Sequence, residues 1–271
     1  MLLVFQEVMK MEKHFLCILT FMLFLTLLVT SSMADLNDGL IVYYSLDGNA
    51  EDSFAGKNGT EKNGATYNDH AGFGKALLLD GTSQYVEVPY DPVIDAVADG
   101  FTIAAWINPT AVDDRRPIVS REHEPDATRG FEFAIKNGSL LAFQLVNEGG
   151  VNKTAVDSTF TPDTNVWTHV AATYDSASGA EFFAHGSSVG TNSSFTGTVN
   201  TAVTPINIGA YIWDPNGYWR TFAGMIDELG IWARVLAPDE IAALAAGTIP
   251  TAAAVKPGDK LAVAWGELKS N

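Results

Sequence analysis

The amino-acid sequence predicts an all-β fold, an antiparallel β-sandwich. Short runs of alternating apolar residues recur along the chain, turn residues separate them, and no helical period interrupts them before residue 238. Hydrophobic residues make up 47% of the 271 residues and charged residues 18%, which is enough apolar material for a packed core. The single cysteine, Cys17, excludes an intrachain disulfide and a cysteine-based zinc site.

The first half of this pattern begins with a strand at residues 40–46 and a long loop rich in Asp, Asn and Gly that runs to Gly64. Strands are expected next at residues 76–79 and 85–88, around the turn Asp80-Gly81. Residues 101–107 carry an apolar residue at every second position, which indicates a strand with one buried face. The Asn137-Gly138 pair, between two alternating apolar runs, predicts a β-hairpin because both residues tolerate positive φ.

The second half is expected to hold strands at residues 167–174, 181–184, 187–191, 206–208 and 222–232. In the last of these, Ile226 would fall on one face of a regular strand, whereas Leu229 and Ile231 would fall on the opposite face. Both sets can reach one core only if an extra residue is inserted at Asp227-Glu228, which predicts a β-bulge there. Residues 238–246 predict one short helix, since proline and two acidic residues begin it and Gly247 ends it.

The N-terminus predicts a secretory signal peptide over residues 1–34, so we expect a secreted protein, extracellular or on the cell surface. Lys10 and Lys13 precede an uncharged run from Phe15 to Thr30, and Ser32-Met33-Ala34 supplies the small residues of a cleavage site. The run is shorter than a membrane-spanning helix requires, so no membrane span is expected after cleavage. We expect one β domain over residues 35–247 and a linker and tail over residues 248–271.

The net charge of −16 argues against binding to polyanions, so nucleic acid is not an expected partner. An acidic surface of this kind suits a protein that holds a hard cation such as Ca²⁺ on oxygen ligands.

Several runs, taken in order, resemble the LamG-like jelly-roll group of the concanavalin A-like lectin/glucanase superfamily. The runs are residues 39–44, 72–81 with Tyr85-Val86, 101–106, 167–171 and 222–229, and they are followed by Trp232, Leu236 and Glu240-Ile241. The resemblance implies a two-sheet jelly roll, often with one bound Ca²⁺, and a role in binding glycans or proteins rather than in catalysis. The hairpin at Phe183-Ala184-His185-Gly186 departs from the family pattern, because His185 stands where an acidic residue is usual.

The predicted calcium ligands are Asp52 and Asp227, with Asp47 or Asn49 and main-chain carbonyls completing the shell. The resemblance supplies this assignment, since the early loop resembles the calcium-associated loop of the family and the Ile226-Asp227-Glu228 run resembles the strand that approaches it. The alternative is that Asp47 and Asn49 only form turns through local hydrogen bonds.

Four aromatic residues mark a candidate ligand-binding loop at residues 210–221, namely Tyr211, Trp213, Tyr218 and Trp219. Exposed rings of this kind stack on sugars and on protein hot spots, whereas a loop that folds back over a sheet edge would bury them. The charged stretch from Arg115 to Glu124 is expected to form a solvated rim, with a binding edge as the alternative.

No catalytic residues are predicted. The pattern Gly186-Ser187-Ser188-Val189-Gly190 matches that of serine hydrolases, yet no histidine follows Ser188 and the pentapeptide lies in a predicted hairpin. A glycosidase needs two facing carboxyl groups, and the adjacent Asp227 and Glu228 would point to opposite faces of a regular strand. His169 is expected to be packed and hydrogen-bonded rather than a ligand.

The sequence thus predicts a secreted, non-catalytic binding module, with calcium-assisted carbohydrate binding as the first choice. The alternatives are an adhesive or structural module that binds an extracellular protein, and a polysaccharide-active hydrolase or lyase. Trp or Tyr on a concave face, beside polar hydrogen-bonding groups, would favour a sugar ligand.

Overall fold

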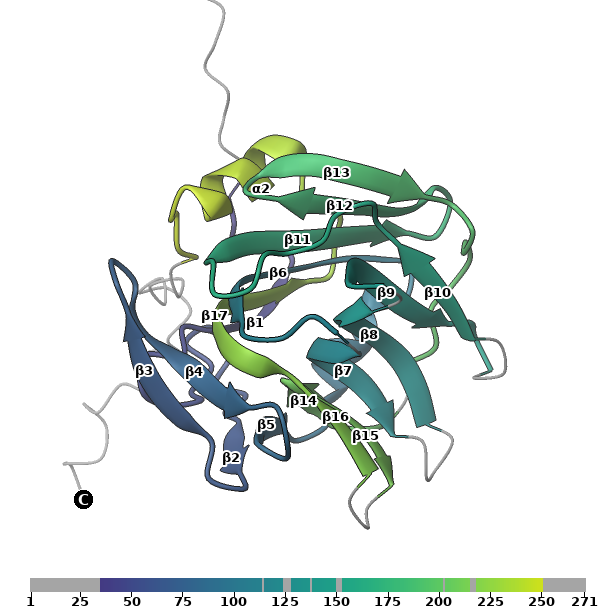
Figure 1. The fold of residues 1–271 in the computed structure, drawn as a ribbon. Helices are drawn as coiled ribbons and strands as arrows, with labels where there is room; N and C mark the ends of the chain where they lie inside the picture. Colours follow the sequence, from purple (N-terminus) through teal and green to yellow (C-terminus); the bar gives the residue numbers. More distant parts are fainter. Residues whose placement is uncertain are drawn as a thin grey trace, which may run out of the picture. The chain divides into compact units, whose positions relative to one another are not determined.

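A computed structural model shows two antiparallel sheets that face each other across a hydrophobic core (Figure 1). It describes residues 35–113, 115–123, 128–136, 138–149, 153–201, 203–214 and 218–250. The expected two-sheet jelly-roll sandwich with one short α-helix is therefore confirmed. In this part of the chain, no helix is long and apolar enough to cross a membrane.

One sheet has eight strands in the described residues and is called sheet A. Its strands are β1 (Leu40–Tyr44), β3 (Thr66–His70), β4 (Gly74–Asp80), β6 (Gly100–Pro109), β11 (Thr168–Asp175), β12 (Gly179–Ala184), β13 (Ser187–Asn192) and β17 (Ala223–Trp232). The order across the sheet is β13-β12-β11-β6-β17-β4-β3, and β1 also pairs with β17.

The other sheet, called sheet B, has nine strands in the same part of the chain. They are β2 (Thr60–Lys62), β5 (Tyr85–Val88), β7 (Arg116–His123), β8 (Thr128–Lys136), β9 (Leu140–Val146), β10 (Lys153–Asp157), β14 (Ile206–Ile208), β15 (Ala210–Asp214) and β16 (Tyr218–Thr221). A 3₁₀ helix, η1 (Pro92–Val97), and the helix α2 (Pro238–Ala245) complete the described elements.

The core forms because each sheet turns the apolar positions of its strands inward. The alternating residues predicted for β6, β8, β9 and β11 are fully buried in one cluster between the sheets: Phe101, Ile103, Ala105, Ile107, Phe131, Phe133, Ile135, Leu141, Phe143, Leu145, Val170, Ala172 and Tyr174. Burial of this apolar surface supplies most of the stabilising free energy of such a fold.

The outer face of sheet A carries a second, smaller core. The helix α2 contributes Ile241 and Leu244, which pack with Ala104, Ala171 and Phe183 of the sheet. Trp232 joins this cluster, and its indole N–H donates to the main-chain oxygen of Leu36 at 2.7 Å. The helix therefore covers one end of the outer face and leaves the neighbouring part of that face to the residues described below.

The predicted bulge in β17 is confirmed, and a change of partner strand explains it. Residues 223–226 of β17 pair with β4, whereas residues 229–232 pair with β1. The register with β6 shifts between Asp227 and Gly230, and Glu228 has a φ of 52°. As a result Ile226 and Leu229, despite their opposite parity, both lie in the inner core.

Two stretches differ from the sequence prediction. The charged stretch expected as a solvated rim forms β7, in which Arg121 and Glu122 are fully buried. The prediction was wrong because a count of charges cannot show that ion pairs, such as Arg121 with Asp95, bring charged side chains into the fold. The loop expected to run to Gly64 contains β2, and β3 follows it, since polar edge strands carry little apolar pattern.

The hairpin between β12 and β13 has the positive φ values of a tight turn, 49° at His185 and 77° at Gly186. Such angles match a two-residue hairpin loop of type I′. The stretch that resembles a serine-hydrolase motif therefore lies in a hairpin, as predicted.

We expect Gly224→Ala to destabilise the sandwich strongly. Gly224 has a φ of 127°, and an added Cβ would lie 2.1 Å from the main-chain oxygen of Asn108. The free energy of unfolding should fall by about 3 kcal/mol or more, since backbone strain and a steric clash act together.

Gly56→Ala is the matched control, because Gly56 has a φ of 70° and nothing lies within 4 Å of the added Cβ. Its cost should stay near 1 kcal/mol, in the range for a strained backbone alone. Denaturant melts of both variants give the comparison, and equal losses would contradict the role assigned to the contact with Asn108.

Candidate functional site

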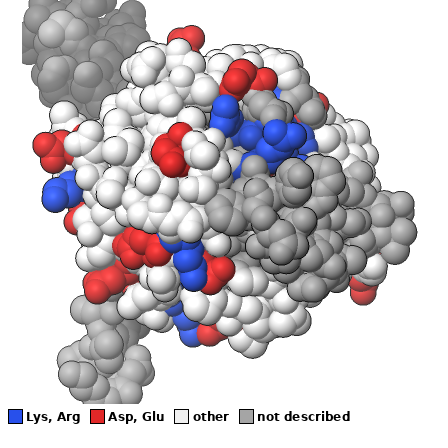
Figure 2. Space-filling model, turned by 60° about the horizontal axis from the view of Figure 1, so that its bottom comes forward, with Lys and Arg blue, Asp and Glu red and all other residues white. Residues whose placement is uncertain are grey.

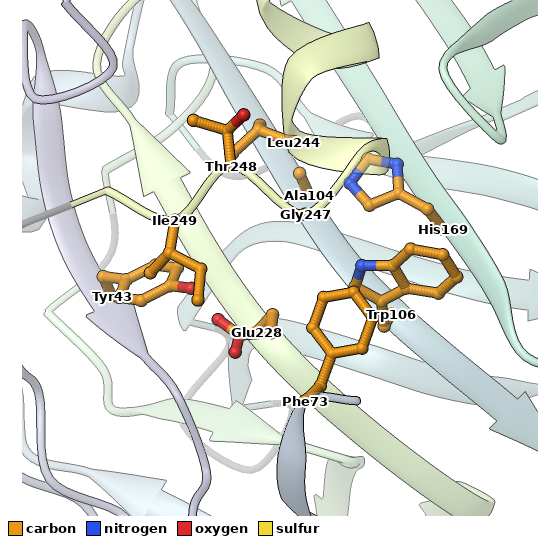
Figure 3. Close-up of a pocket in the computed structure, with 10 residues that line it drawn as sticks. All are labelled: Tyr43, Phe73, Ala104, Trp106, His169, Glu228, Leu244, Gly247, Thr248 and Ile249. Atoms are coloured by element: carbon orange, nitrogen blue, oxygen red, sulfur yellow. The ribbon is translucent and has the colours of Figure 1, made fainter. Parts of the chain in front are cut away.

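A pocket lies on the outer face of sheet A, beside the end of α2 (Figure 3). Its lining residues come from six separate segments of the chain: Tyr43, Phe73, Ala104, Trp106, His169, Glu228, Leu244, Gly247, Thr248 and Ile249. The free volume of the pocket is about 10 Å³, which is room for one water molecule or one hydroxyl group.

Strand alternation places the aromatic and histidine side chains of this wall. Trp106 and His169 are cross-strand neighbours on β6 and β11, two residues beyond the outward-facing pair Ala104 and Ala171. They therefore point to the same outer face, and their rings meet edge to face with centroids 5.5 Å apart. Figure 3 shows the indole nitrogen of Trp106 on the ring edge that faces the pocket.

A buried aromatic stack stands behind this wall. The ring of His70, at the end of β3, stacks on Trp167 with centroids 3.6 Å apart and on Phe73 with centroids 4.8 Å apart. Phe73 also contacts Trp106, at 5.2 Å between centroids. This stack fixes the two rings, Phe73 and Trp106, that a ligand in the pocket would meet first.

The β17 bulge supplies the acidic groups. Asp227 is fully buried, and its Oδ2 lies 2.6 Å from Nδ1 of His70, while its Oδ1 accepts the N–H of Glu228. Glu228 lines the pocket itself, between Tyr43 and Phe73 in Figure 3. A regular strand would send these adjacent residues to opposite faces, and the predicted bulge removes that alternation here.

Burial shifts the protonation of these groups. It raises the pKa of Asp227 to about 8, with the nearby charge of Asp47 acting in the same direction, and it raises the pKa of Glu228 to about 7. Burial lowers the pKa of His70, and it lowers the pKa of His169 to about 3. Burial thus favours the uncharged form of each of these four groups.

Two buried polar atoms of the pocket residues have no hydrogen-bond partner among the described residues. They are Oε2 of Glu228 and Nδ1 of His169, whose side chain is only 2% exposed. The expectation that His169 is fully hydrogen-bonded is thus not met at this atom. Buried polar atoms without a partner are costly and rare in folded proteins.

The predicted calcium ligands fall into two groups. Asp52 organises the loop after β1, because its carboxylate accepts the main-chain N–H groups of residues 43, 54, 55 and 57 at 2.9–3.0 Å. With each oxygen accepting two bonds, Asp52 does not fit as a metal ligand. Asn49 makes the turn weighed as the alternative, since its side-chain oxygen accepts the N–H of Glu51.

Asp47 and Asp227 are the two predicted ligands that lie within electrostatic reach of one another. Asp47 accepts the N–H of Lys75 at 2.8 Å. Across the described ranges, no group of three or more His, Cys, Asp and Glu side chains is arranged to hold a metal. The side chains therefore fit Ca²⁺ only in part, and most of its 6–8 oxygen ligands would have to be main-chain carbonyls and water.

The predicted aromatic loop forms the β15–β16 hairpin of sheet B. Tyr211 is buried beneath the Arg115 guanidinium, whose carbon lies 3.8 Å from the ring centroid. The side chains of Trp213, Tyr218 and Trp219 lie outside the described part of the structure. Arg115 also forms a bidentate ion pair with Glu132, so that carboxylate serves the fold.

The remaining charged surface is mixed. On the face shown in Figure 2, Lys and Arg form one cluster at the upper right and lie singly at the left and lower parts, among scattered Asp and Glu.

With this fold and pocket, the chain belongs to the concanavalin A-like lectin/glucanase superfamily, whose family model matches residues 80–242. A search of curated protein sequences found no significant match.

Solved structures with the same fold share less than 25% of their residues with this chain. Domain 4 of AbnA, an extracellular arabinanase from Geobacillus stearothermophilus solved with arabinotriose, is similar at 19% identity and a TM-score of 0.58. The match covers 76% of this chain and 98% of that domain. The binding domain of botulinum neurotoxin DC is similar in two solved complexes. The complex with SialylT matches at 18% identity and a TM-score of 0.57 and covers 78% of this chain. The complex with rat synaptotagmin II matches at 19% identity and a TM-score of 0.58 and covers 79% of this chain. The match spans about half of the toxin domain, 52% of its length in each structure.

We expect Asp52→Ala to destabilise the protein whether or not calcium is present, because the variant leaves four main-chain donors without their acceptor. The free energy of unfolding should fall by about 3 kcal/mol, in the range for loss of bonds to a buried carboxylate. Asn49→Ala, which removes one exposed hydrogen bond, should cost less than about 1 kcal/mol. Melts in Ca²⁺ and in chelator test this, and a loss confined to the calcium-containing sample would instead support Asp52 as a ligand.

The wild-type protein in chelator should lose stability as pH rises from about 4 to about 8. Asp227 ionises near its ordinary pKa of 3.8 when unfolded but only near 8 when folded, so its contribution is complete below the lower value and lost through the upper one. Glu228 acts in the same direction. Asp227→Asn should flatten this decline by about 2 kcal/mol or more, as measured by urea melts across the range. An unchanged slope would show that Asp227 is not the group that titrates.

Proposed function

We propose that this protein is a non-catalytic carbohydrate-binding module and that the pocket on sheet A is its ligand site. The observation that carries the proposal is the pairing of the half-exposed rings of Trp106 and Phe73 with the carboxyl group of Glu228, which lines the same small pocket and has one buried oxygen without a hydrogen-bond partner in the described residues. A sugar can contact both the rings and the polar groups, since its C–H face stacks on aromatic rings and its hydroxyls donate and accept hydrogen bonds.

Each wall of the pocket has a part in this binding. Trp106 and Phe73 offer ring surface to the apolar face of a sugar. One hydroxyl group enters the innermost space, where Oε2 of Glu228 accepts its hydrogen. Thr248, exposed at the rim after α2, can bond an outer hydroxyl.

The absence of catalysis is part of the same proposal. Glu228 is the one carboxyl group among the residues that line the pocket. Its neighbour Asp227 is fully buried and bonded to His70, so it does not face a ligand. Hydrolysis of a glycosidic bond requires two carboxyl groups on either side of that bond.

The similar solved structures support a binding role in two ways. One was solved with arabinotriose, and the toxin binding domain with SialylT and with a protein receptor. A protein partner is therefore the second candidate, and the small, polar pocket favours the sugar. The sequence of residues 1–34 supports export, and N-terminal sequencing of protein recovered outside the producing cell tests it.

We also propose that Ca²⁺ assists binding by holding the loop of Asp47 beside the bulge. The charge of Asp47 raises the pKa of Asp227, and a cation between them would relieve that repulsion. Ca²⁺ should raise the melting temperature of the wild type and have less effect on Asp47→Asn, while Asp80→Asn, on an exposed turn, should respond as the wild type does. Equal melting temperatures in Ca²⁺ and chelator would refute calcium binding.

A glycan-panel assay on residues 35–271, run in Ca²⁺ and in chelator, tests the main proposal. We expect selective binding to at least one neutral glycan, weakened in chelator. Trp106→Ala should weaken it tenfold or more, in the range for loss of ring stacking on a sugar. Tyr85→Ala, which removes a ring from sheet B, is the control and should bind as the wild type does.

Circular dichroism and melting curves must show that Trp106→Ala remains folded. Binding that survives in a folded Trp106→Ala variant would place the ligand elsewhere, and a wild type that binds no glycan would overturn the proposed function.

A further inference from the structure

We infer that the pocket selects neutral sugars and rejects acidic ones, and that Glu228 determines this specificity. The inference rests on the proposed function and adds the class of ligand. It starts from the charges that a sugar would meet on the outer face of sheet A.

The pocket has acidic groups and no basic one. None of its lining residues is Lys or Arg, and His169 is held uncharged by burial. Glu228 forms no ion pair with a Lys or Arg side chain among the residues that the structure describes. An incoming carboxylate would therefore meet the carboxylate of Glu228 with no Lys or Arg side chain of the pocket to compensate it.

The geometry of Glu228 makes this repulsion local. The side chain is half-buried at the bulge, and its Oε2 is buried without a hydrogen-bond partner in the described residues. That atom can only accept a hydrogen bond, which a sugar hydroxyl donates and an ionised carboxylate cannot. The like-charge contact is made where water is displaced, so solvent screens it less than it would on an open surface.

The same contact favours a neutral ligand. A hydroxyl group in the pocket donates a hydrogen bond to the free oxygen of Glu228, which removes the energetic cost of a buried oxygen without a partner. One side chain thus favours the neutral ligand and disfavours the acidic one, and the two effects together set a specificity. The toxin domain whose fold resembles this one was solved with SialylT, so fold likeness alone would not lead to this inference.

The test uses pairs of oligosaccharides that differ only in charge. Trigalacturonate is compared with its methyl ester, and cellotriose and arabinotriose are each compared with a form oxidised to a carboxylate at a primary hydroxyl. Titration calorimetry of residues 35–271 at pH 8.5 keeps carboxyl groups at the protein surface ionised.

We expect the neutral member of any pair that binds to bind at least tenfold more tightly than its acidic partner. Acidic members that bind as tightly as neutral ones, or more tightly, overturn the inference and leave the proposed function standing. Failure of both members of every pair, and of the glycan panel, overturns the proposed function, and the inference falls with it.

Glu228→Gln tests the residue. It keeps the size of the side chain and removes the charge, so the preference for the neutral sugar should shrink to threefold or less, with weaker binding of the neutral member. Glu148→Gln, at an exposed position in the turn after β9, removes the same charge elsewhere and should leave the preference unchanged. A preference that persists in folded Glu228→Gln, or that falls equally in Glu148→Gln, would show that Glu228 is not the determinant.

Discussion

The change of partner along β17 is the constraint on which the rest of the outer face depends. This strand crosses the middle of sheet A, pairing with β4 in its first part and with β1 in its second. The hydrogen-bond ladder of β17 shifts register where the partner strand changes, and Glu228 adopts a positive φ at that point. Both apolar halves of the strand then reach the inner core, and two acidic side chains are turned outward.

The buried polar groups at this bulge would lower the stability of the fold if they had no partners. The aromatic stack holds one such partner, His70, in place. A buried carboxyl group needs a partner, which Asp227 finds in His70. The imidazole is itself held between flat apolar rings, so its position follows from packing as much as from the hydrogen bond. Specificity and stability are therefore supported by the same few contacts.

Much of the fold could be predicted because its signals are local. Alternation in β6, β8 and β9 and the turn at Asn137-Gly138 are properties of neighbouring residues. Even the bulge was predictable, since the parity of Ile226 and Leu229 conflicts within one strand. The polar strands β2, β3 and β7 could not be predicted in this way. Edge strands and strands with buried ion pairs lack the alternating apolar residues that mark a strand in the sequence.

The site was less predictable for a related reason. Asp227 was marked as a functional residue, but its partner His70 is 157 positions away in sequence and carries no motif of its own. Alternation in residues 101–107 places Trp106 on the face opposite the buried residues, but it does not show that His70, Phe73 and Trp167 gather beside it. The loop of Asp52 shows a second difficulty, since a carboxylate that holds main-chain N–H groups has the same local sequence as one that holds a metal.

The wide spacing of the pocket residues has a consequence for folding kinetics. Tyr43 and Ile249, near the two ends of the described chain, line the same small space. Contacts of such long sequence separation form late, after loop-closure entropy has been overcome. The outer-face pocket is therefore complete only when β1, β17 and the segment after α2 have all docked, and not when either sheet alone has formed.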